Sequence, residues 1–181
     1  MKMLARVAMW VALAAAQTAS LAAAEVGAAI SGSNAEQLVI LVRHAEKALD
    51  QGKDPGLTSV GEARAQSLRH VLEHANVAVI ITTEWQRTRA TATPLAESLK
   101  LTPIVVDSSA GPADGHADRV AAAVRKHQAD VVLVVGHSNT VPAIIKALGG
   151  PAVAAIGDAD YGNLYLLWRR PGQVRLIQAR Y

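Results

Sequence analysis

Residues 38–47 read Leu-Val-Ile-Leu-Val-Arg-His-Ala-Glu-Lys. Five consecutive apolar residues are followed directly by Arg43 and His44. An unbroken apolar run of this length is typical of a strand that is buried on both faces. Ligands of open α/β sheets bind just outside the carboxyl ends of the strands. The stretch therefore predicts a buried strand that carries Arg43 and His44 to the floor of an active site.

Strand-like and helix-like segments alternate along most of the remaining chain. The pattern predicts further strands over 77–82, 104–106 and 130–135, and helices over 59–74, 87–100, 116–128 and 142–149. This alternation predicts an α/β fold, a three-layer α/β/α sandwich with a mainly parallel sheet. Two last strand-like runs flank Arg170-Pro171-Gly172-Gln173, where Pro-Gly favours a type II turn. They predict an antiparallel C-terminal hairpin at one side of the sheet.

The helix predicted over 59–74 carries its own boundary signal. Ser59 and Glu62 form an S-x-x-E capping box. Arg64 lies in the middle of the predicted apolar face, so it either covers the core with its alkyl stem or points toward the site. The next helix contains Pro94, which is expected to bend or split it. The residues predicted to share the apolar face of the first helix are Val60, Leu68, Val71, Leu72 and Ala75.

The N-terminal segment reads as a signal peptide. Lys2 and Arg6 form a basic start, residues 7–16 form an apolar run, and Ala22-Ala23-Ala24 provides small residues at a cleavage site. The apolar run is short for a membrane span. An uncleaved N-terminal anchor is the alternative interpretation. Export to the periplasm or the outside medium, with no membrane contact after cleavage, is the expectation.

These signals divide the chain into three parts. Residues 1–24 are the predicted signal peptide, and residues 25–37, rich in Gly, Ala and Ser, are a predicted flexible lead-in. Residues 38–181 form the predicted folded domain, of a length that suits one compact unit.

Composition excludes several classes of function. Eighteen Lys and Arg, minus the two in the predicted leader, leave sixteen against fifteen Asp and Glu. The domain is thus close to neutral and has no basic cluster with interleaved aromatics, so no nucleic-acid partner is expected. The chain has no Cys, which excludes disulfides, thiolate catalysis and zinc–thiolate sites.

Four side chains converge at the predicted strand ends. The first strand ends in Arg43 and His44, the second leads within a few residues to Arg87, and the fourth ends in Gly136-His137. Arginine is a permanently charged planar fork that matches phosphate oxygens. A neutral imidazole can attack phosphorus and form a covalent intermediate. Together the four residues predict an anion pocket with an imidazole nucleophile.

Three segments, in this order, resemble the histidine phosphatase superfamily, which is named after cofactor-dependent phosphoglycerate mutase. Residues 41–47 resemble its Arg-His-Gly signature, with Ala45 in place of Gly. Residues 83–92 resemble the segment with the second Arg, and residues 136–139 the segment with the second His. The resemblance implies the α/β fold of that family and a phosphatase-type activity without metal or other cofactor.

The resemblance also implies roles. His44 would be the phosphorylated nucleophile, and Arg43, Arg87 and His137 would bind the phosphoryl group, with His137 close to the transferred phosphorus. Many family members place an acid in the loop after the third strand, where it protonates the leaving oxygen.

Two aspartates are candidates for the general acid. Asp114 is the candidate, with Asp107 as a weaker one, and each also reads as a cap or turn residue. Phytase-like members carry an acid directly after the second His, but Ser138 stands there. The sequence therefore argues against that branch.

Three functions remain open at this stage. The first is an exported, metal-independent phosphohydrolase of the histidine acid phosphatase type, acting through His44 on a phosphomonoester or phosphoramidate. Its substrate would be a small phosphorylated molecule or a phosphorylated protein side chain. The second is a protein that binds phospho-ligands without turnover, suggested by Ala45 and the uncertain acid. A phosphomutase is disfavoured because the chain has little room for loops that retain an intermediate.

Other signals are interpreted as structural. His70-Val71-Leu72-Glu73-His74 fits the H-x-x-E-H zinc-peptidase pattern, but a solvated helix face explains it equally well. His116 and His127 flank a predicted helix and are expected at the surface. Glu84 and Asn139 lie beside site residues and either orient them or serve the fold. The loop with Tyr161 borders the pocket only if the fold brings it there.

Overall fold

Strand β1 (Gln37–Arg43) lies inside a six-stranded sheet, which explains its unbroken apolar run. The computed structural model describes residues 36–49, 52–109, 115–128 and 130–181, all within one compact unit, Ala35–Tyr181. The sheet order is β3-β2-β4-β1-β5-β6. The strands are β2 (Val77–Thr82), β3 (Ile104–Val105), β4 (Val131–Gly136), β5 (Asn163–Arg170) and β6 (Gln173–Arg180).

The predicted mixed topology is confirmed. Strands β1, β2, β3 and β4 pair in parallel, whereas β5 runs antiparallel to both β1 and β6. The C-terminal hairpin turns at Gly172, whose φ of 73° is the conformation that a type II turn requires of its third residue. The predicted signal peptide and residues 25–35 of the lead-in lie outside the described residues.

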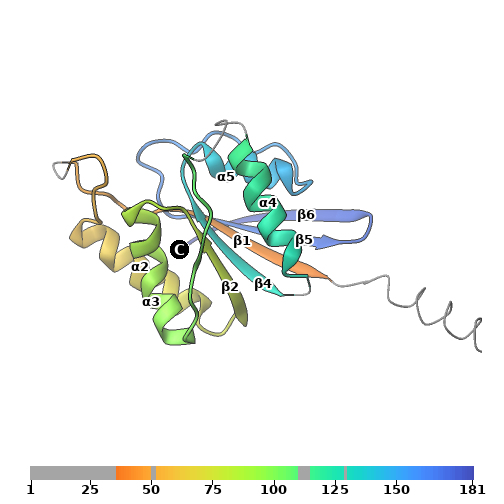
Figure 1. Ribbon diagram of the computed structural model, residues 1–181, viewed down its shortest axis with the longest axis horizontal. Helices are drawn as coiled ribbons and strands as arrows, with labels where there is room; N and C mark the ends of the chain where they lie inside the picture. The colour runs from red at the N-terminus through yellow and green to blue at the C-terminus, as the bar shows by residue number, and fades with distance from the viewer. Residues whose placement is uncertain (1–35, 50–51, 110–114, 129) are drawn as a thin grey trace, which may run out of the picture. The chain divides into compact units, whose positions relative to one another are not determined.

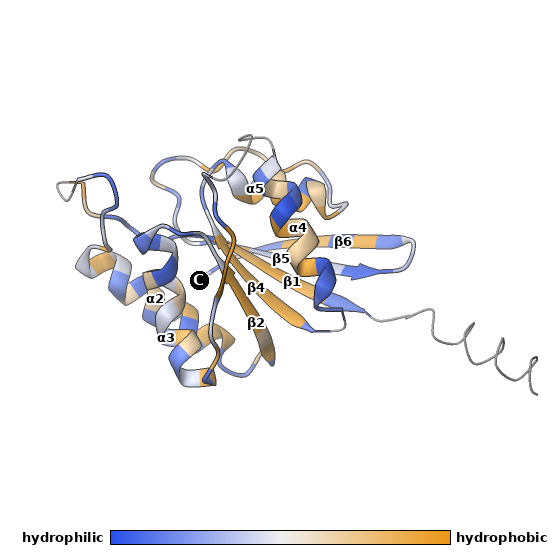
Figure 2. Ribbon diagram, in the orientation of Figure 1, coloured by the Kyte–Doolittle hydropathy of each residue, from blue (hydrophilic) through white to orange (hydrophobic). Residues whose placement is uncertain are grey.

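Two pairs of helices cover the two faces of the sheet, which makes the three layers visible in Figure 1. Ile40 and Val42 of β1 face one core, and Val39 and Leu41 face the other. Burying each such side chain contributes roughly 1.5–3 kcal/mol. Figure 2 shows the strands as mainly hydrophobic and the helices as mixed. The helices are α2 (Ser59–Leu72) and α3 (Gln86–Leu99) on the first face, and α4 (His116–Lys126) and α5 (Thr140–Ala147) on the second.

The predicted buried face of α2 was wrong in its phase. Val60 and Val71 are 59% and 49% exposed, while Leu68 and Leu72 are buried as predicted. The buried side also includes Gly61, which packs against the loop after β1 so closely that a Cβ would collide with that backbone. The helix is therefore turned by a backbone contact that hydropathy does not encode. Its cap is Thr58, whose hydroxyl accepts from the N–H of Gly61, rather than Ser59.

The expected split of the third helix at Pro94 is not found. Helix α3 runs without interruption through Pro94. An internal proline costs about 3 kcal/mol, and the buried residues Leu95 and Ala96 after it keep the helix on the sheet.

None of the helices in the described part of the chain combines the length and hydropathy needed to cross a bilayer.

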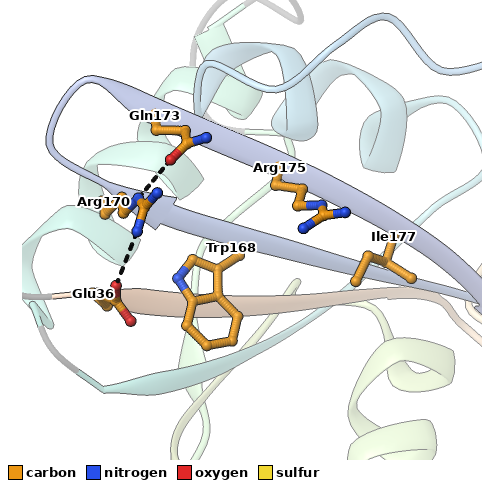
Figure 3. A pocket seen from close by; sticks show the side chains of 6 residues that line it. All are labelled: Glu36, Trp168, Arg170, Gln173, Arg175 and Ile177. Atoms are coloured by element: carbon orange, nitrogen blue, oxygen red, sulfur yellow. Dashed lines mark hydrogen bonds and ion pairs between the residues drawn. The ribbon is translucent and has the colours of Figure 1, made fainter.

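The hairpin β5–β6 carries apolar side chains in the open. Trp168 and Ile177 are 46% and 49% exposed. They line a shallow pocket of about 330 Å³ (Figure 3). At its end Arg170 donates to Gln173 and lies 3.7 Å from a carboxylate oxygen of Glu36. This surface is formed by different elements from those that carry Arg43 and His44.

Candidate active site

The two predicted site histidines lie together where β1 and β4 end. The N–H of His44 donates to the carbonyl of Gly136 at 2.9 Å, which locks the two strand ends in register. His137 follows Gly136, and the His44 and His137 ring centroids are 5.4 Å apart at 65°. Parallel pairing of β1 with β4 thus creates the pair of imidazoles.

His44 has one ring nitrogen held and one available. Its Nδ1 lies 2.8 Å from the carbonyl oxygen of Ala45, and a carbonyl can only accept, so Nδ1 carries the proton. Nε2 is then the unprotonated, nucleophilic nitrogen. Burial lowers the pKa of His44 to about 4, and the nearby charges of Arg87 and Arg43 act in the same direction. At neutral pH the ring is uncharged, as a nucleophile must be.

Arg43 is fixed by the loop before β5. Its Nη1 donates to the carbonyls of Gly157 at 2.7 Å and Asp158 at 3.1 Å. Its guanidinium carbon lies 4.2 Å from the centre of the Tyr161 ring. The buried Nε of Arg43 has no hydrogen-bond partner among the described residues. A buried donor without a partner is costly, and an oxygen of a bound anion would satisfy it.

Arg87 repeats this arrangement from the first turn of α3. Its guanidinium carbon lies 4.6 Å from the centre of the Trp85 ring, and Nη1 is 3.8 Å from Oδ1 of Asp54. Its Nε is also buried without a partner in the described part of the protein. Both arginines are therefore held in place by other groups, while the buried Nε–H of each has no hydrogen-bond partner among the described residues.

His137 is 9% exposed and lies against Thr83, with 3.2 Å between Nε2 and Oγ1. Burial, together with the charges of Arg87 and of His44 when it is protonated, lowers the pKa of His137 to about 3. Its backbone N–H donates to Oγ1 of Thr140 in the first turn of α5. The second imidazole is thus neutral at rest and fixed by two threonines.

Ala45 fits where the resembling signature has Gly. It is fully buried, and its N–H donates to Oγ1 of Thr91 at 2.9 Å. Its φ is not positive, since only Asn76 and Lys100 among the described non-glycine residues have positive φ. The methyl group is therefore accommodated without backbone strain.

Of the two candidates for the general acid, Asp107 lies within the described residues. Asp107 accepts from the N–H and hydroxyl of Ser109 at 2.8 and 2.7 Å, the geometry of a local turn. Asp114 lies outside the described residues. Glu84 accepts from the N–H and hydroxyl of Ser108, which ties the loop after β2 to the loop after β3.

Arg64 points to Glu46 rather than into the pocket. Its Nε lies 2.9 Å from both carboxylate oxygens, and its Nη2 lies 2.7 Å from Oε1. This pair braces the chain just after His44 against helix α2.

The prediction of a surface position for His116 was wrong. His116 is 3% exposed, and its Nδ1 lies 3.3 Å from the carbonyl of Asp107. The contact with the Asp107 backbone comes from the loop after β3, and hydropathy does not predict it. His70 and His74 are 84% and 93% exposed. Within the described ranges no group of three or more His, Cys, Asp or Glu is arranged to hold a metal ion.

Sequence reasoning left some site residues undecided or unnamed. Tyr161 lies 6.1 Å from the His44 ring and forms one wall of the site. Trp85 and Thr83 stand within the recognised segment, but nothing in their local pattern assigned them a role. Asn139 is exposed and makes no side-chain cap to α5. Only the folded structure shows which of these residues lie in the site.

Comparisons with known proteins agree with this geometry. The family model described as histidine phosphatase superfamily (branch 1) matches residues 39–109. A phosphohistidine phosphatase, SixA, from Agrobacterium tumefaciens is similar in structure, with a TM-score of 0.58, 20% identity, and coverage of 82% of this chain and 100% of that one. No curated protein matches the sequence.

Two further solved structures share the fold. An alpha-ribazole-5'-P phosphatase from Escherichia coli K-12 has a TM-score of 0.63 and 17% identity, covering 80% of this chain and 96% of its own. A mycobacterial glucosyl-3-phosphoglycerate phosphatase has a TM-score of 0.59 and 16% identity, covering 81% and 98%. The chain is thus similar to the histidine phosphatase superfamily (branch 1) over residues 39–109, and its fold is the one that these phosphatases share.

Proposed function

We propose that this protein is a phosphohydrolase in which His44 carries the phosphoryl group as a covalent intermediate. His44 Nε2 attacks phosphorus, so an N–P bond forms while the bond from phosphorus to the leaving oxygen or nitrogen breaks. The leaving group takes up a proton. Water then attacks the phosphohistidine, releasing inorganic phosphate and restoring the neutral imidazole.

The observation that carries the proposal is the state of His44. Its Nδ1 proton is committed to the Ala45 carbonyl, which leaves the Nε2 lone pair free. Around it stand Arg43 and Arg87, each with a buried Nε that lacks a partner among the described residues. Such fixed donors stabilise charge on non-bridging phosphoryl oxygens without reorganisation during the reaction.

The electrostatic surroundings favour a doubly charged phosphoryl group. The charged side chains that act on the pKa of His44 are Arg87, Arg43 and Lys47. Those that act on His137 are His44, Arg87, His116 and Arg43. All of them are cationic or become so on protonation. A dianion would be attracted, and its presence would raise the depressed pKa values of both imidazoles.

Two substrate classes fit this site, phosphomonoesters and phosphoramidates. Asp107 is engaged in a local turn, so the acid for an ester's leaving oxygen would be Asp114, whereas a phosphoramidate depends less on such an acid. Among the similar structures, one is named for phosphohistidine and two for small phosphate esters. A small phosphorylated molecule or a phosphorylated protein side chain is the proposed substrate.

One of the two arguments for a protein that binds phospho-ligands without turnover no longer holds. Ala45 suggested a degenerate signature, yet it is buried without strain and donates to Thr91. We therefore favour turnover. Metal independence, export of the domain and the absence of a nucleic-acid partner remain proposals that rest on the sequence.

The test is hydrolysis of p-nitrophenyl phosphate and of phosphoramidate by the purified domain, with and without EDTA and vanadate. We expect metal-independent turnover, inhibition by vanadate, and loss of at least about 10³-fold in His44→Ala. His74→Ala, which alters an exposed histidine, is the matched control and should retain full activity.

A phosphoenzyme trapped by rapid quenching at alkaline pH should carry its phosphate on the peptide that contains His44. Turnover that persists in folded His44→Ala would refute the mechanism. Vanadate binding without any turnover would support the binding-only function. Export is tested separately, by the mass of the protein recovered from the periplasm or medium, where loss of residues 1–24 is expected.

A further inference from the structure

A buried pair of threonine hydroxyls lies behind His137. Thr83 follows β2 and is 2% exposed, and Thr88 lies in the first turn of α3 and is fully buried. Their Oγ1 atoms are 2.9 Å apart, and Thr83 Oγ1 is 3.2 Å from Nε2 of His137. The contacts form a continuous line from α3 to the second imidazole.

The direction of the protons along this line follows from the backbone. Thr88 Oγ1 lies 2.8 Å from the carbonyl of Trp85 and 3.2 Å from the carbonyl of Thr83. Carbonyl oxygens only accept, so the single proton of the Thr88 hydroxyl is directed to them. The Thr88 oxygen can then only accept from Thr83, and the Thr83 hydroxyl must donate to it.

Thr83 has no second proton to offer His137. Its hydroxyl has one donor and two acceptor positions, and the donor is used on Thr88. Its acceptor positions face the N–H of Trp85, at 3.4 Å, and Nε2 of His137. The His137 contact is therefore a hydrogen bond only if His137 Nε2 carries the proton.

We propose that Thr83 and Thr88 are positioning residues that hold His137 in its Nε2–H form and orient its ring beside His44. The proposal deepens the phosphohydrolase function and rests on it for its kinetic consequence. The hydrogen bond made by one ring nitrogen decides which nitrogen of a histidine is protonated. Here the decision comes from the same segment that supplies Arg87, so the second arginine and the second histidine are set by one piece of chain.

The structure predicts different effects on His137 when each of the two hydroxyls is removed. Without the Thr88 hydroxyl, the Thr83 proton loses its acceptor and can turn toward His137 Nε2, which would move the His137 proton to Nδ1. Without the Thr83 hydroxyl, the ring loses its partner altogether. Serine at either position keeps the hydroxyl and should preserve the arrangement.

The test reads the tautomer directly. In protein labelled with ¹⁵N-histidine, long-range ¹H–¹⁵N correlation spectra at neutral pH distinguish Nε2–H from Nδ1–H rings. The His137 signals among the six histidines are assigned by their loss in His137→Gln. We expect Nε2–H in the wild type, in Thr83→Ser and in Thr88→Ser, and a shift toward Nδ1–H in Thr88→Val.

Kinetics supply the second readout. Thr83→Val and Thr88→Val should lose about tenfold in kcat/KM, the value of one hydrogen bond to a reacting group, while the serine variants stay near wild type. Should a valine variant fail to fold, the corresponding alanine variant replaces it, and the wild-type tautomer is read without any threonine variant.

An Nδ1–H ring in the folded wild type overturns the proposal, and so does an unchanged tautomer with unchanged kcat/KM in Thr88→Val. Failure of the phosphohydrolase function would look different. The wild type would then turn over no phosphate ester or phosphoramidate, while the tautomer of His137 and its response to Thr88→Val would still be measurable.

Discussion

The guanidinium carbon of Arg43 lies 4.2 Å from the centre of the Tyr161 ring, although the two residues stand at opposite ends of the described domain's sequence. Arg43 ends the central strand, and Tyr161 precedes β5, which pairs with that strand. The ring and the carbonyls of the same loop leave Arg43 one orientation. The loop before β5 therefore shapes the surroundings of Arg43 in the candidate site.

Tyr161→Ala should weaken the hold on Arg43. A cation–π contact contributes about 0.5–2 kcal/mol, so we expect kcat/KM for p-nitrophenyl phosphate to fall about tenfold and phosphate to inhibit less strongly. Tyr161→Phe keeps the ring and should remain near wild type. Trp168→Ala removes an exposed aromatic on the hairpin and serves as the control. Equal losses in the Phe and Ala variants would show that the ring is not what matters.

Activity should persist to unusually acid pH. The pKa of His44 is lowered to about 4, and protonation of Nε2 removes the nucleophile, so the acid limb of kcat/KM should bend near pH 4. A separate bend near pH 6 belongs to the second ionisation of the substrate phosphate. If the acid limb of the kcat/KM profile that belongs to the enzyme bent near 6.5, the ordinary pKa of histidine, the buried and neutral state of His44 would be contradicted.

Stability should fall in acid for the same reason. Burial lowers the pKa values of His44, His137 and His116 in the folded state, whereas the unfolded chain titrates near 6.5. The stabilising contribution of these three histidines to the free energy of unfolding is fully present above pH 6.5. It is lost as the pH falls toward 3, because the unfolded state then binds more protons than the folded state. At about 1.4 kcal/mol per pKa unit, several kcal/mol are at stake. Denaturant unfolding at pH 7 and 4.5 measures this, and His44→Gln should reduce the difference.

Gly61→Ala should destabilise the protein despite the better helix propensity of alanine. A Cβ at Gly61 would collide with the carbonyl of Glu46, two residues after His44. The overpacking should cost roughly 1–3 kcal/mol of unfolding free energy and displace the loop, lowering kcat as well. Ser67→Ala lies on the exposed side of the same helix and should be neutral or stabilising. A Gly61→Ala protein as stable and active as the wild type would show that the backbone at Glu46 shifts at no cost to make room for the methyl group.

The placement of the candidate site residues was predictable because it depends on local signals at the ends of strands. An unbroken apolar run predicts a strand in the middle of a sheet, and parallel strands deliver the residues that follow them to one edge. That reasoning placed Arg43 and His44 beside His137, and Arg87 nearby. It failed for Val60 and Val71, because a backbone contact at Gly61 sets the rotation of α2.

The sequence by itself determined the mixed sheet, the C-terminal hairpin and the four charged or titratable side chains at the strand ends, since hydropathy and turn residues act through neighbours in the chain. Only the tertiary structure decided that Tyr161 covers Arg43, that His116 is buried, and that Thr83 and Thr88 stand behind His137. These depend on how loops from separate strands close over one edge. Such contacts are set by packing between distant segments, which no local pattern records.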